Sequence, residues 1–338
     1  MPGQPLDDGI AHAIVAAASA APSIHNSQPW RFRLDARQRV FEVFAAEPHT
    51  LPDPDLDARA VHLSVGAALC NLAAAAAHLG WEPVVRLLPR PDVPGLLATV
   101  RLAGAPRAAR LRRSDLYRAI WRRRSSRLPF SPTPVPEAVL AELAEAVRFD
   151  GAELHRPGRA ERTRLLGLTS EAEERATACP ARRAESLRWL ATPGGATGLP
   201  AYALGLRDSA GHLPMRGFAG PPDALPRGRA EFEPDPQLFL LTTRLDRPVD
   251  WLRAGQALQH ALLLLTLHGL RASMMHQALE WPDLRSRMAG AEHEQVTPQM
   301  LLRIGYGPAG FPTPRHPTTA LLERTAAPSA VRTPVAVR

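Results

Sequence analysis

The chain alternates between short stretches in which every second residue is apolar and longer stretches with helical periodicity. Strands are expected over residues 30–34, 40–44, 84–88, 97–102, 238–243 and 301–305. Helices are expected over residues 10–21, 58–79, 161–178 and 251–267, and in an amphipathic segment that begins at Pro136. Helices and short strands interleaved in this way predict an α+β (α/β) fold.

Residues 191–236 interrupt this pattern, because they contain eight glycines and eight prolines in 46 residues. Such a composition breaks helices and strands, so we expect no regular structure there. In a compact domain a segment of this kind is usually a lid or a disordered excursion. We therefore expect a lid near residues 191–222 that folds over a cleft.

Two apolar helices of the chain share a local pattern. The segments that begin at Gly66 and Gly255 align without gaps at an offset of 189, and each ends at a glycine fourteen residues on. Two unrelated Ala/Leu-rich helices would give the same pattern, so the alternatives are chance and an internal duplication. The duplication predicts a first half over residues 1–106, a second half over 107–326 and a tail over 327–338.

The composition excludes several cofactor classes. All 41 basic residues are arginine, and the chain has no lysine. A Schiff-base enzyme and a P-loop both need a lysine, so both are excluded. Codon bias explains the missing lysine, because asparagine (two copies) and isoleucine (five) are scarce too. The net charge of +8 is therefore a weak sign of nucleic-acid binding, and no reader motif accompanies it.

Other features bound the compartment and the partners. The two cysteines are too few for a disulfide framework or a zinc site. No uninterrupted apolar run reaches the roughly 18 residues of a membrane span. Asp7 and Asp8 stand where a signal peptide would be basic. We expect a cytoplasmic protein that binds neither nucleic acid nor membrane.

Residues 21–30, Ala-Pro-Ser-Ile-His-Asn-Ser-Gln-Pro-Trp, are the most informative peptide. They lie between a predicted helix and a predicted strand, where polar groups can face a ligand. A helix stop at Pro22 and a turn built on Asn26 would explain the peptide structurally. Because asparagine is so scarce in this chain, we favour a ligand-facing amide at Asn26.

A second peptide is basic. Arg123, Arg124, Ser125 and Arg127 place guanidinium and hydroxyl groups within five residues, and Arg315 lies just beyond the last predicted strand. Arginine grips a phosphate with two parallel hydrogen bonds, so this set suits a phosphate group. Taken alone, the peptide is more typical of a solvated basic surface.

Together these motifs resemble the FMN-dependent nitroreductase superfamily, and more closely its subgroup that includes the mycobacterial Acg proteins. The matching features are Ala-Pro-Ser-x-x-Asn-x-Gln-Pro-Trp at 21–30, Arg-Arg-Ser-x-Arg at 123–127 followed by Pro-Val-Pro, the helix of residues 255–270, Ile304-Gly305-Tyr306 and Arg315. The resemblance implies a mixed sheet packed by helices, with FMN at a dimer interface. With the repeated helix, it implies two fused nitroreductase-like halves with a lid insert.

The resemblance also implies a set of cofactor-binding residues. The phosphate and ribityl chain of FMN would be held by Arg123, Arg124, Ser125, Arg127 and Arg315. The flavin would be reached from the other half by Pro22, Ser23 and Asn26. A loop after the Gly269 helix would line the isoalloxazine ring; its residues are Met274, Met275, His276 and Gln277. The alternative is that Met274 and Met275 are plain core residues.

The chain departs from the family pattern in two respects. Family members carry both motifs in each subunit, whereas here each motif occurs once, which implies one FMN per chain and a monomer that mimics the family homodimer. Lysines that many members place near the flavin are absent, and Thr313 stands where one would be. An arginine must therefore provide the charge near the flavin.

The resemblance implies an oxidoreductase that passes electrons from NAD(P)H through FMN to a small electron-poor acceptor such as a nitroaromatic or a quinone. No acid or base side chain is required, and His25 and His276 are the pocket candidates. The alternative is a flavin-sequestering, stress-related protein without turnover, because the insert would shut the site. No metal is expected, since Glu292-His293-Glu294 is more typical of a solvated surface.

Overall fold

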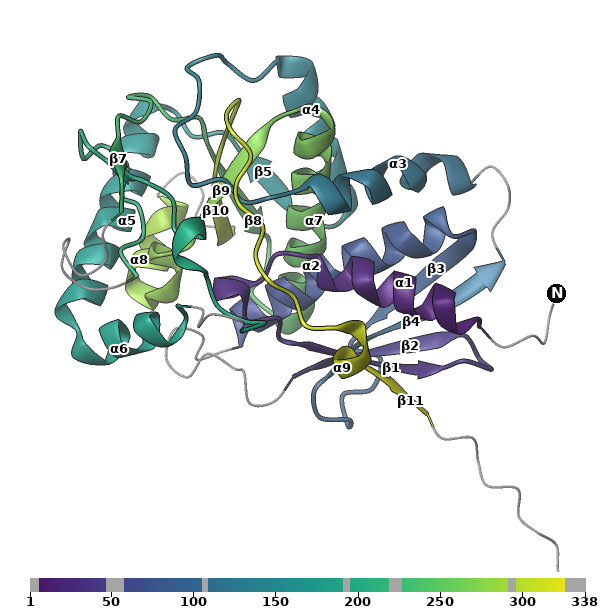
Figure 1. Ribbon diagram of the computed structural model, residues 1–338. Helices are drawn as coiled ribbons and strands as arrows, with labels where there is room; N and C mark the ends of the chain where they lie inside the picture. Colours follow the sequence, from purple (N-terminus) through teal and green to yellow (C-terminus); the bar gives the residue numbers. More distant parts are fainter. Residues whose placement is uncertain are drawn as a thin grey trace, which may run out of the picture.

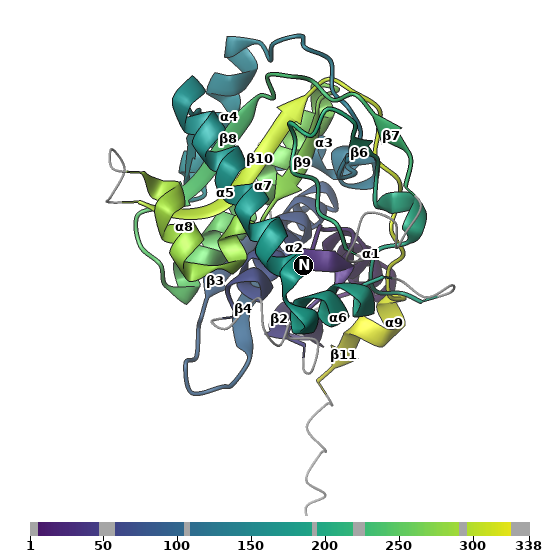
Figure 2. The ribbon, with the colours of Figure 1, turned by 90° about the vertical axis from the view of Figure 1, so that its left-hand side faces the viewer.

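The fold is built on two main β-sheets with a pair of apolar helices between them (Figures 1 and 2). The computed structural model describes residues 6–46, 58–104, 109–190, 195–218, 227–290 and 296–325, without the side chains of residues 109–115. This mixed arrangement of strands and helices is the α/β class that the hydrophobic pattern predicts.

The first sheet is formed mainly by the N-terminal part of the chain. Its strand order is β11-β1-β2-β4-β3, with β1 at Trp30–Asp35, β2 at Val40–Ala45, β3 at Trp81–Leu87, β4 at Leu96–Gly104 and β11 at Leu322–Arg324. Neighbouring strands are antiparallel except β11, which runs parallel to β1. Alternate residues Trp30, Phe32 and Leu34 are buried, as the period of two predicts.

The second sheet is antiparallel and has the order β5-β8-β10-β9. Its strands are β5 at Glu153–His155, β8 at Leu238–Thr243, β9 at Arg271–Met275 and β10 at Thr297–Gly305. All six residues of β8 are buried, which explains why its first four residues are all apolar. Strand β9 was not expected, because residues 274–277 were interpreted as a loop.

Nine α-helices are found in the described residues: α1 at Asp8–Ser19, α2 at Arg59–His78, α3 at Ala109–Arg122, α4 at Glu137–Phe149, α5 at Arg159–Ala178, α6 at Pro180–Arg188, α7 at Pro248–Leu267, α8 at Pro282–Ala289 and α9 at Thr318–Leu321. Three 3-10 turns accompany them: η1 at Ile24–Asn26, η2 at Ala201–Ala203 and η3 at Ala278–Glu280. Helix α3 was not expected, because its arginine-rich sequence hides its apolar positions.

Helices α2 and α7 pack against each other in the middle of the molecule (Figure 1). Their contact is closest where the repeated glycines meet. A methyl group on Gly66 would lie 2.2 Å from the carbonyl oxygen of Leu252, and one on Gly255 would lie 2.1 Å from that of Leu63. Beyond the crossing, Gln259 donates a 2.6 Å hydrogen bond to Asn71. The two equivalent positions of the sequence repeat are therefore in mutual contact.

The C-terminal segment returns to the first sheet. It leaves β10, runs along the surface and ends in α9 and β11 beside β1 (Figure 1). The backbone of Thr325 donates to the carbonyl of Leu34 at 3.1 Å. The residues before position 106 therefore do not form the first sheet alone, because residues 318–325 at the other end of the chain pack with it. The proposed tail at 327–338 lies outside the described residues.

The Gly/Pro-rich insert contains more regular structure than expected. Turn η2 and two paired strands, β6 at Arg207–Asp208 and β7 at Arg229–Ala230, lie within it. Residues 191–194 and 219–226 of the insert are outside the described residues. The expectation of no regular structure is therefore wrong for these short elements, which pair with each other rather than with a main sheet.

Helix α2 is an apolar core helix. By length and composition it is the one helix in the described part of the chain that would suffice to cross a membrane, and 83% of its most apolar window is buried inside the structure. A search for uninterrupted apolar runs does not identify α2 as a possible membrane span, because His62 and Asn71 interrupt its apolar sequence. The protein itself covers this helix on nearly all sides.

The α2–α7 crossing predicts a difference between two glycine substitutions. Gly66→Ala should lower the free energy of unfolding by about 2 kcal/mol or more, because the added methyl group would overlap backbone atoms of α7. Gly167→Ala is the matched control, because Gly167 is exposed on α5 with no atom near the added methyl group. This substitution should raise the free energy of unfolding by about 0.5–1 kcal/mol. Urea unfolding measures both, and equal effects would contradict the assigned crossing.

Candidate functional site

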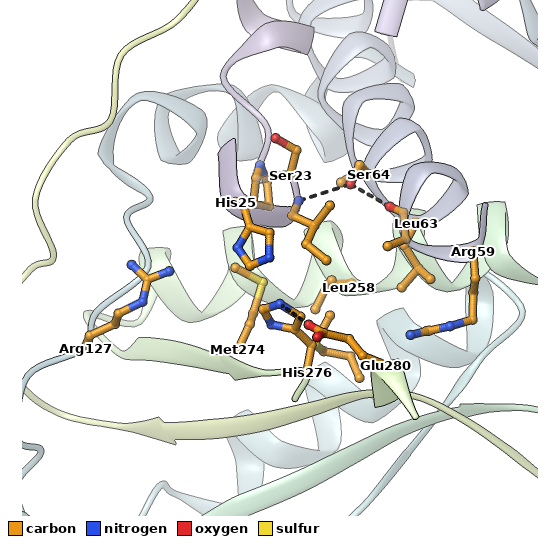
Figure 3. Close-up of a pocket in the computed structure, with 15 residues that line it drawn as sticks. Ser23, His25, Arg59, Leu63, Ser64, Arg127, Leu258, Met274, His276 and Glu280 are labelled. Carbon is orange, nitrogen blue, oxygen red and sulfur yellow. Dashed lines mark hydrogen bonds and ion pairs between the residues drawn. The ribbon is translucent and has the colours of Figure 1, made fainter. Parts of the chain in front are cut away.

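Two adjoining cavities lie between the loop of residues 22–28 and strand β9, and one of them is also lined by α2. They share the lining residues Pro22, Ser23, His25, Arg127 and Met274. The first, here called the arginine cavity, is also lined by Asn26, Arg123, Arg124, Ser125, Leu199, Phe311, Thr313 and Arg315. The second, here called the histidine cavity, is also lined by Ile24, Arg59, Ala60, Leu63, Ser64, Ala67, Leu258, His276, Glu280 and Met300 (Figure 3).

The loop of residues 22–28 has an unusual backbone. His25, Asn26 and Gln28 have positive φ angles of 49°, 58° and 51°. Non-glycine residues in this region cost free energy and persist only where the surroundings hold them. Here Ser64 Oγ accepts from the backbone of Ile24 at 3.3 Å, and Ser23 Oγ accepts from that of Gln28 at 3.0 Å. The loop is therefore fixed in a conformation that turns His25 and Asn26 into the protein.

Asn26 joins the insert to the C-terminal segment. Its Nδ2 donates to the carbonyls of Gly198 at 3.1 Å and Pro314 at 3.0 Å, and its Oδ1 accepts from Arg315 Nη1 at 2.6 Å. The side chain lines the arginine cavity. Its hydrogen-bonding groups, however, are bound to other residues of the protein.

The arginines of the predicted phosphate site converge from two distant parts of the chain. Arg315 donates to the carbonyls of Ser19 at 2.7 Å and Ala21 at 3.2 Å, so it caps the C-terminal end of α1. Arg127 donates to the carbonyl of Ala203 in the insert at 3.0 Å. Among the described residues, neither arginine forms an ion pair with a carboxylate.

Arg123 is the least satisfied of these side chains. It is 5% exposed, and its Nε and Nη1 atoms are buried without a hydrogen-bond partner. Its one weak bond runs from Nη2 to the carbonyl of Ala20 at 3.5 Å. Buried guanidinium groups normally have all donors paired, so these free donors mark a place for an acceptor group.

The electrostatics of the arginine cavity point the same way. Burial, followed by repulsion from Arg315 and Arg124, lowers the pKa of Arg123 to about 9. Burial and the nearby Arg124 lower the pKa of Arg315 to about 10. Burial, Arg216 and Arg227 lower the pKa of Arg127 to about 10. All three stay protonated at neutral pH, so the cavity concentrates positive charge and favours an anion.

The histidine cavity holds a buried polar cluster. The rings of His25 and His276 lie 5.4 Å apart, and His276 Nε2 lies 3.1 Å from Glu280 Oε1 (Figure 3). Arg216 from the insert donates to His25 Nε2 at 3.2 Å and forms an ion pair with Glu280. The ring of Trp189 stacks on His25 at 5.9 Å. The insert is therefore latched onto this cavity by Arg216.

The charge states of this cluster follow from its burial. Burial, Arg216 and His276 lower the pKa of His25 well below its usual value, and burial and Arg216 lower that of His276. Burial alone would raise the pKa of Glu280, but Arg216 and His276 outweigh it and hold the pKa at about 2. At neutral pH the cluster consists of two neutral imidazoles, one carboxylate and one guanidinium.

Most of the predicted site residues line one of the two cavities. Met274 and His276 do so, whereas Met275 packs in the hydrophobic core with Leu301 and does not line either cavity. Gln277 is buried and donates to the carbonyl of Pro214 in the insert at 3.0 Å. Met274 and Met275 are in β9, so alternate side chains point to opposite faces, which corrects the expectation of a loop.

Two residues of the site were missed. Arg216 lies in a glycine-rich segment without a motif, and Glu280 is marked only by its spacing of four residues from His276. Their contact joins positions 64 residues apart in the sequence, which no local pattern reveals. The triplet Glu292-His293-Glu294 lies outside the described residues.

The chain was compared with known proteins. No family model matches the sequence. A protein of Mycobacterium tuberculosis named "Putative NAD(P)H nitroreductase Rv3131" is 30% identical over 315 residues, which cover 92% of this chain and 90% of the relative. Another, named "Putative NAD(P)H nitroreductase acg", is 28% identical over 312 residues, which cover 91% and 92%. A crystal structure of a nitroreductase with bound FMN from Bacteroides fragilis matches with 15% identity and a TM-score of 0.35, over 65% of this chain and 98% of that chain.

The similarity to the mycobacterial relatives extends over nearly the whole length of both chains. The chain belongs to the nitroreductase family, as its 30% identity to the first of these relatives shows. Acg itself is among the similar proteins, which confirms the resemblance based on residues 21–30 and 123–127.

The unpaired donors of Arg123 predict a response to phosphate. At tenfold above its Kd, inorganic phosphate should stabilise the cofactor-free protein by about 1.4 kcal/mol, which raises its Tm by roughly 2 °C or more. Arg123→Met should abolish this rise without lowering the Tm measured in the absence of phosphate, because a buried unpaired charge is removed. Arg118→Met, at an exposed position of helix α3, which ends just before Arg123, should respond like the wild type. An unchanged response in Arg123→Met would place the anion elsewhere.

Proposed function

We propose that the protein is an FMN-binding oxidoreductase of nitroreductase type. It would take electrons from NAD(P)H and pass them to a small electron-poor acceptor such as a nitroaromatic or a quinone. The observation that carries this proposal is the arginine cavity, where Arg123 has buried donors without a partner. The names of the mycobacterial relatives support the NAD(P)H-dependent activity, and the motifs of residues 21–30 and 123–127 support FMN as the cofactor.

The residues present fit the phosphate end of FMN. A phosphate monoester carries a charge of about −1.5 to −2 at neutral pH and three acceptor oxygens. Arg123 and Arg124 would bind it, with Ser125 beside the ribityl chain. Arg315 would hold the pocket in shape, because most of its donors are committed to the end of α1 and to Asn26. A phosphate would neutralise the repulsion that lowers the pKa of Arg123.

The flavin ring would extend from the arginine cavity into the histidine cavity. Pro22 and Ser23 would face it from one side and Met274 from the other, with apolar Leu63 and Leu258 excluding water. Bound FMN supplies hydride acceptance and electron transfer, which the side chains themselves cannot provide. The protein contributes position and charge, so no acid or base side chain is assigned to the reaction.

The lysine-free composition leaves arginine as the charge near the flavin. Arg127 lines both cavities, so it stands where the ring would join the ribityl chain. Thr313, at the position of a family lysine, hydrogen-bonds Arg315 instead of carrying a charge. Arg127 would therefore supply positive charge beside a bound flavin.

The site is assembled from both proposed halves of one chain. Residues 22–28 come from the first half, and residues 123–127 and 274–276 come from the second. We propose that the chain acts as a monomer that carries a single complete site, in place of the two sites of a family homodimer.

One cofactor per chain is testable by titration. The purified protein should bind FMN at a ratio near one, and Arg123→Met and Asn26→Ala should each raise the Kd for FMN at least tenfold, since each removes a polar group of the site. Arg118→Met again serves as the control. A ratio near two, or unchanged affinity in both variants, would contradict a single site.

The alternative function is FMN sequestration without turnover, as in a stress-related binding protein. It is favoured by one observation, the latch of Arg216 onto Glu280 and His25. Phe218 of the insert and Trp189 just before it also contact the ring of His25, so a nicotinamide that approached His25 from this side would be blocked.

Anaerobic reduction by NADPH distinguishes the two functions. Rapid bleaching of the flavin absorbance on adding NADPH is expected for the oxidoreductase, and no bleaching within minutes is expected for sequestration. If the latch is the obstacle, Arg216→Met or deletion of residues 195–218 should restore reduction at least tenfold. Should FMN bind tightly while both variants stay inert, the oxidoreductase function would be wrong and the insert would not be the cause.

A further inference from the structure

We propose that His25, His276 and Glu280 form a binding site for one divalent transition-metal ion such as Zn²⁺, and that the guanidinium of Arg216 occupies this site while the insert is closed. This inference does not depend on FMN binding or on turnover, because it rests on the geometry of the histidine cavity.

The three side chains offer a suitable ligand set. One potential ligand atom from each of the three residues lies within 4.8 Å of the other two. His276 Nε2 and Glu280 Oε1 are already 3.1 Å apart. Ligands at about 2.0–2.2 Å from a tetrahedral zinc are roughly 3.4 Å from each other. An approach of about 1.4 Å at most would therefore close the set around an ion.

The hydrogen bonds of His25 show that the guanidinium of Arg216 already occupies the position that a metal cation would take. A guanidinium has donors only, so His25 Nε2 must accept from Arg216 Nη1, and its proton is on Nδ1. His25 is 5% exposed, and this Nδ1 atom is buried without a partner. The same Arg216 also pairs with Glu280. Arg216 thus satisfies one histidine and the carboxylate, as a metal ion would.

Charge makes the two occupants mutually exclusive. Glu280 and Arg216 together are neutral, whereas a divalent ion added beside Arg216 would leave a net charge of +2, close to the guanidinium of Arg127. Removing Arg216 leaves the ion and Glu280 with a net charge of +1. Because Arg216 belongs to the insert, metal binding and closure of the insert compete.

The proposed ion would have an open coordination position. Two histidines and one carboxylate are the protein ligands of several catalytic zinc sites, in which water or substrate takes the fourth position. All three ligands line the histidine cavity, so the fourth position would face it. A ligand with a carbonyl or anionic oxygen would suit this position.

The test is a titration of the full-length protein with Co²⁺, followed by competition with Zn²⁺. In Arg216→Met we expect one Co²⁺ per chain, the visible absorbance bands of tetrahedral Co²⁺, and a Kd at least tenfold lower than that of the wild type. Arg287→Met is the matched control, because Arg287 forms an ion pair with Glu171 on the exposed surface. It should bind Co²⁺ like the wild type.

Ligand substitutions establish where the ion binds. In the Arg216→Met background, His276→Gln should abolish the Co²⁺ bands, whereas His268→Gln, at an exposed histidine paired with Glu142, should keep them. Absence of Co²⁺ binding in folded Arg216→Met, or binding that survives His276→Gln, would overturn the proposal.

A second measurement uses the wild type, so that it does not depend on the folding of any Arg216 variant. Saturating Zn²⁺ should increase protease cleavage within residues 195–218 severalfold, because the ion displaces the latch. His276→Gln should show no such increase. Equal cleavage of the wild type with and without Zn²⁺ would also contradict the proposal. Neither readout requires FMN or NADPH, so these results are independent of the oxidoreductase test.

Discussion

The rest of the structure depends on the close contact of α2 and α7 at Gly66 and Gly255. Backbones can approach this closely only where neither residue has a side chain. The contact fixes the distance between the two sheets, because each helix packs on a different one. It therefore also fixes the gap in which the loop of residues 22–28 faces Met274 and His276. Both helices also line the histidine cavity, α2 through Leu63 and α7 through Leu258, so their contact helps to set the dimensions of that cavity.

The two cavities differ in how their charges are balanced. In the histidine cavity Arg216 offsets Glu280, and the neutral imidazoles add no charge. Among the described residues, no carboxylate offsets the charge of the arginine cavity. Its guanidiniums donate to carbonyl oxygens, and Arg123 makes only one weak hydrogen bond of this kind. Burying such charges costs stability that the large apolar core must supply. The protein thus keeps one cavity in a state that an anion would relieve, and the other in a state whose charges are already balanced.

Local sequence signals predicted the elements whose apolar pattern is strong, such as β8 and α4, and the loop of residues 22–28. The arginine cluster was predicted only through a family resemblance, because Arg315 and Arg123 are far apart in the chain. Helix α3 was missed because its many arginines obscure the periodicity, and β9 because a five-residue strand after a glycine resembles a loop. The contact of Arg216 with Glu280 depends on how the insert folds back, and no pattern within either segment encodes it. Sequence therefore predicted the lining of the arginine cavity better than the segment that covers the histidine cavity.

The pairing of β11 with β1 has a consequence for the order of events during synthesis. Strand β1 is made early and β11 is the last of the described strands, so the outer edge of the first sheet stays open until about 290 further residues have been added. An open edge can pair with other chains, and in β1 that edge belongs to a strand whose Trp30, Phe32 and Leu34 must be buried. Arg315, just ahead of β11, closes the site at the same late moment. The arginine cavity therefore cannot be complete in a nascent chain before residue 315 has been synthesised.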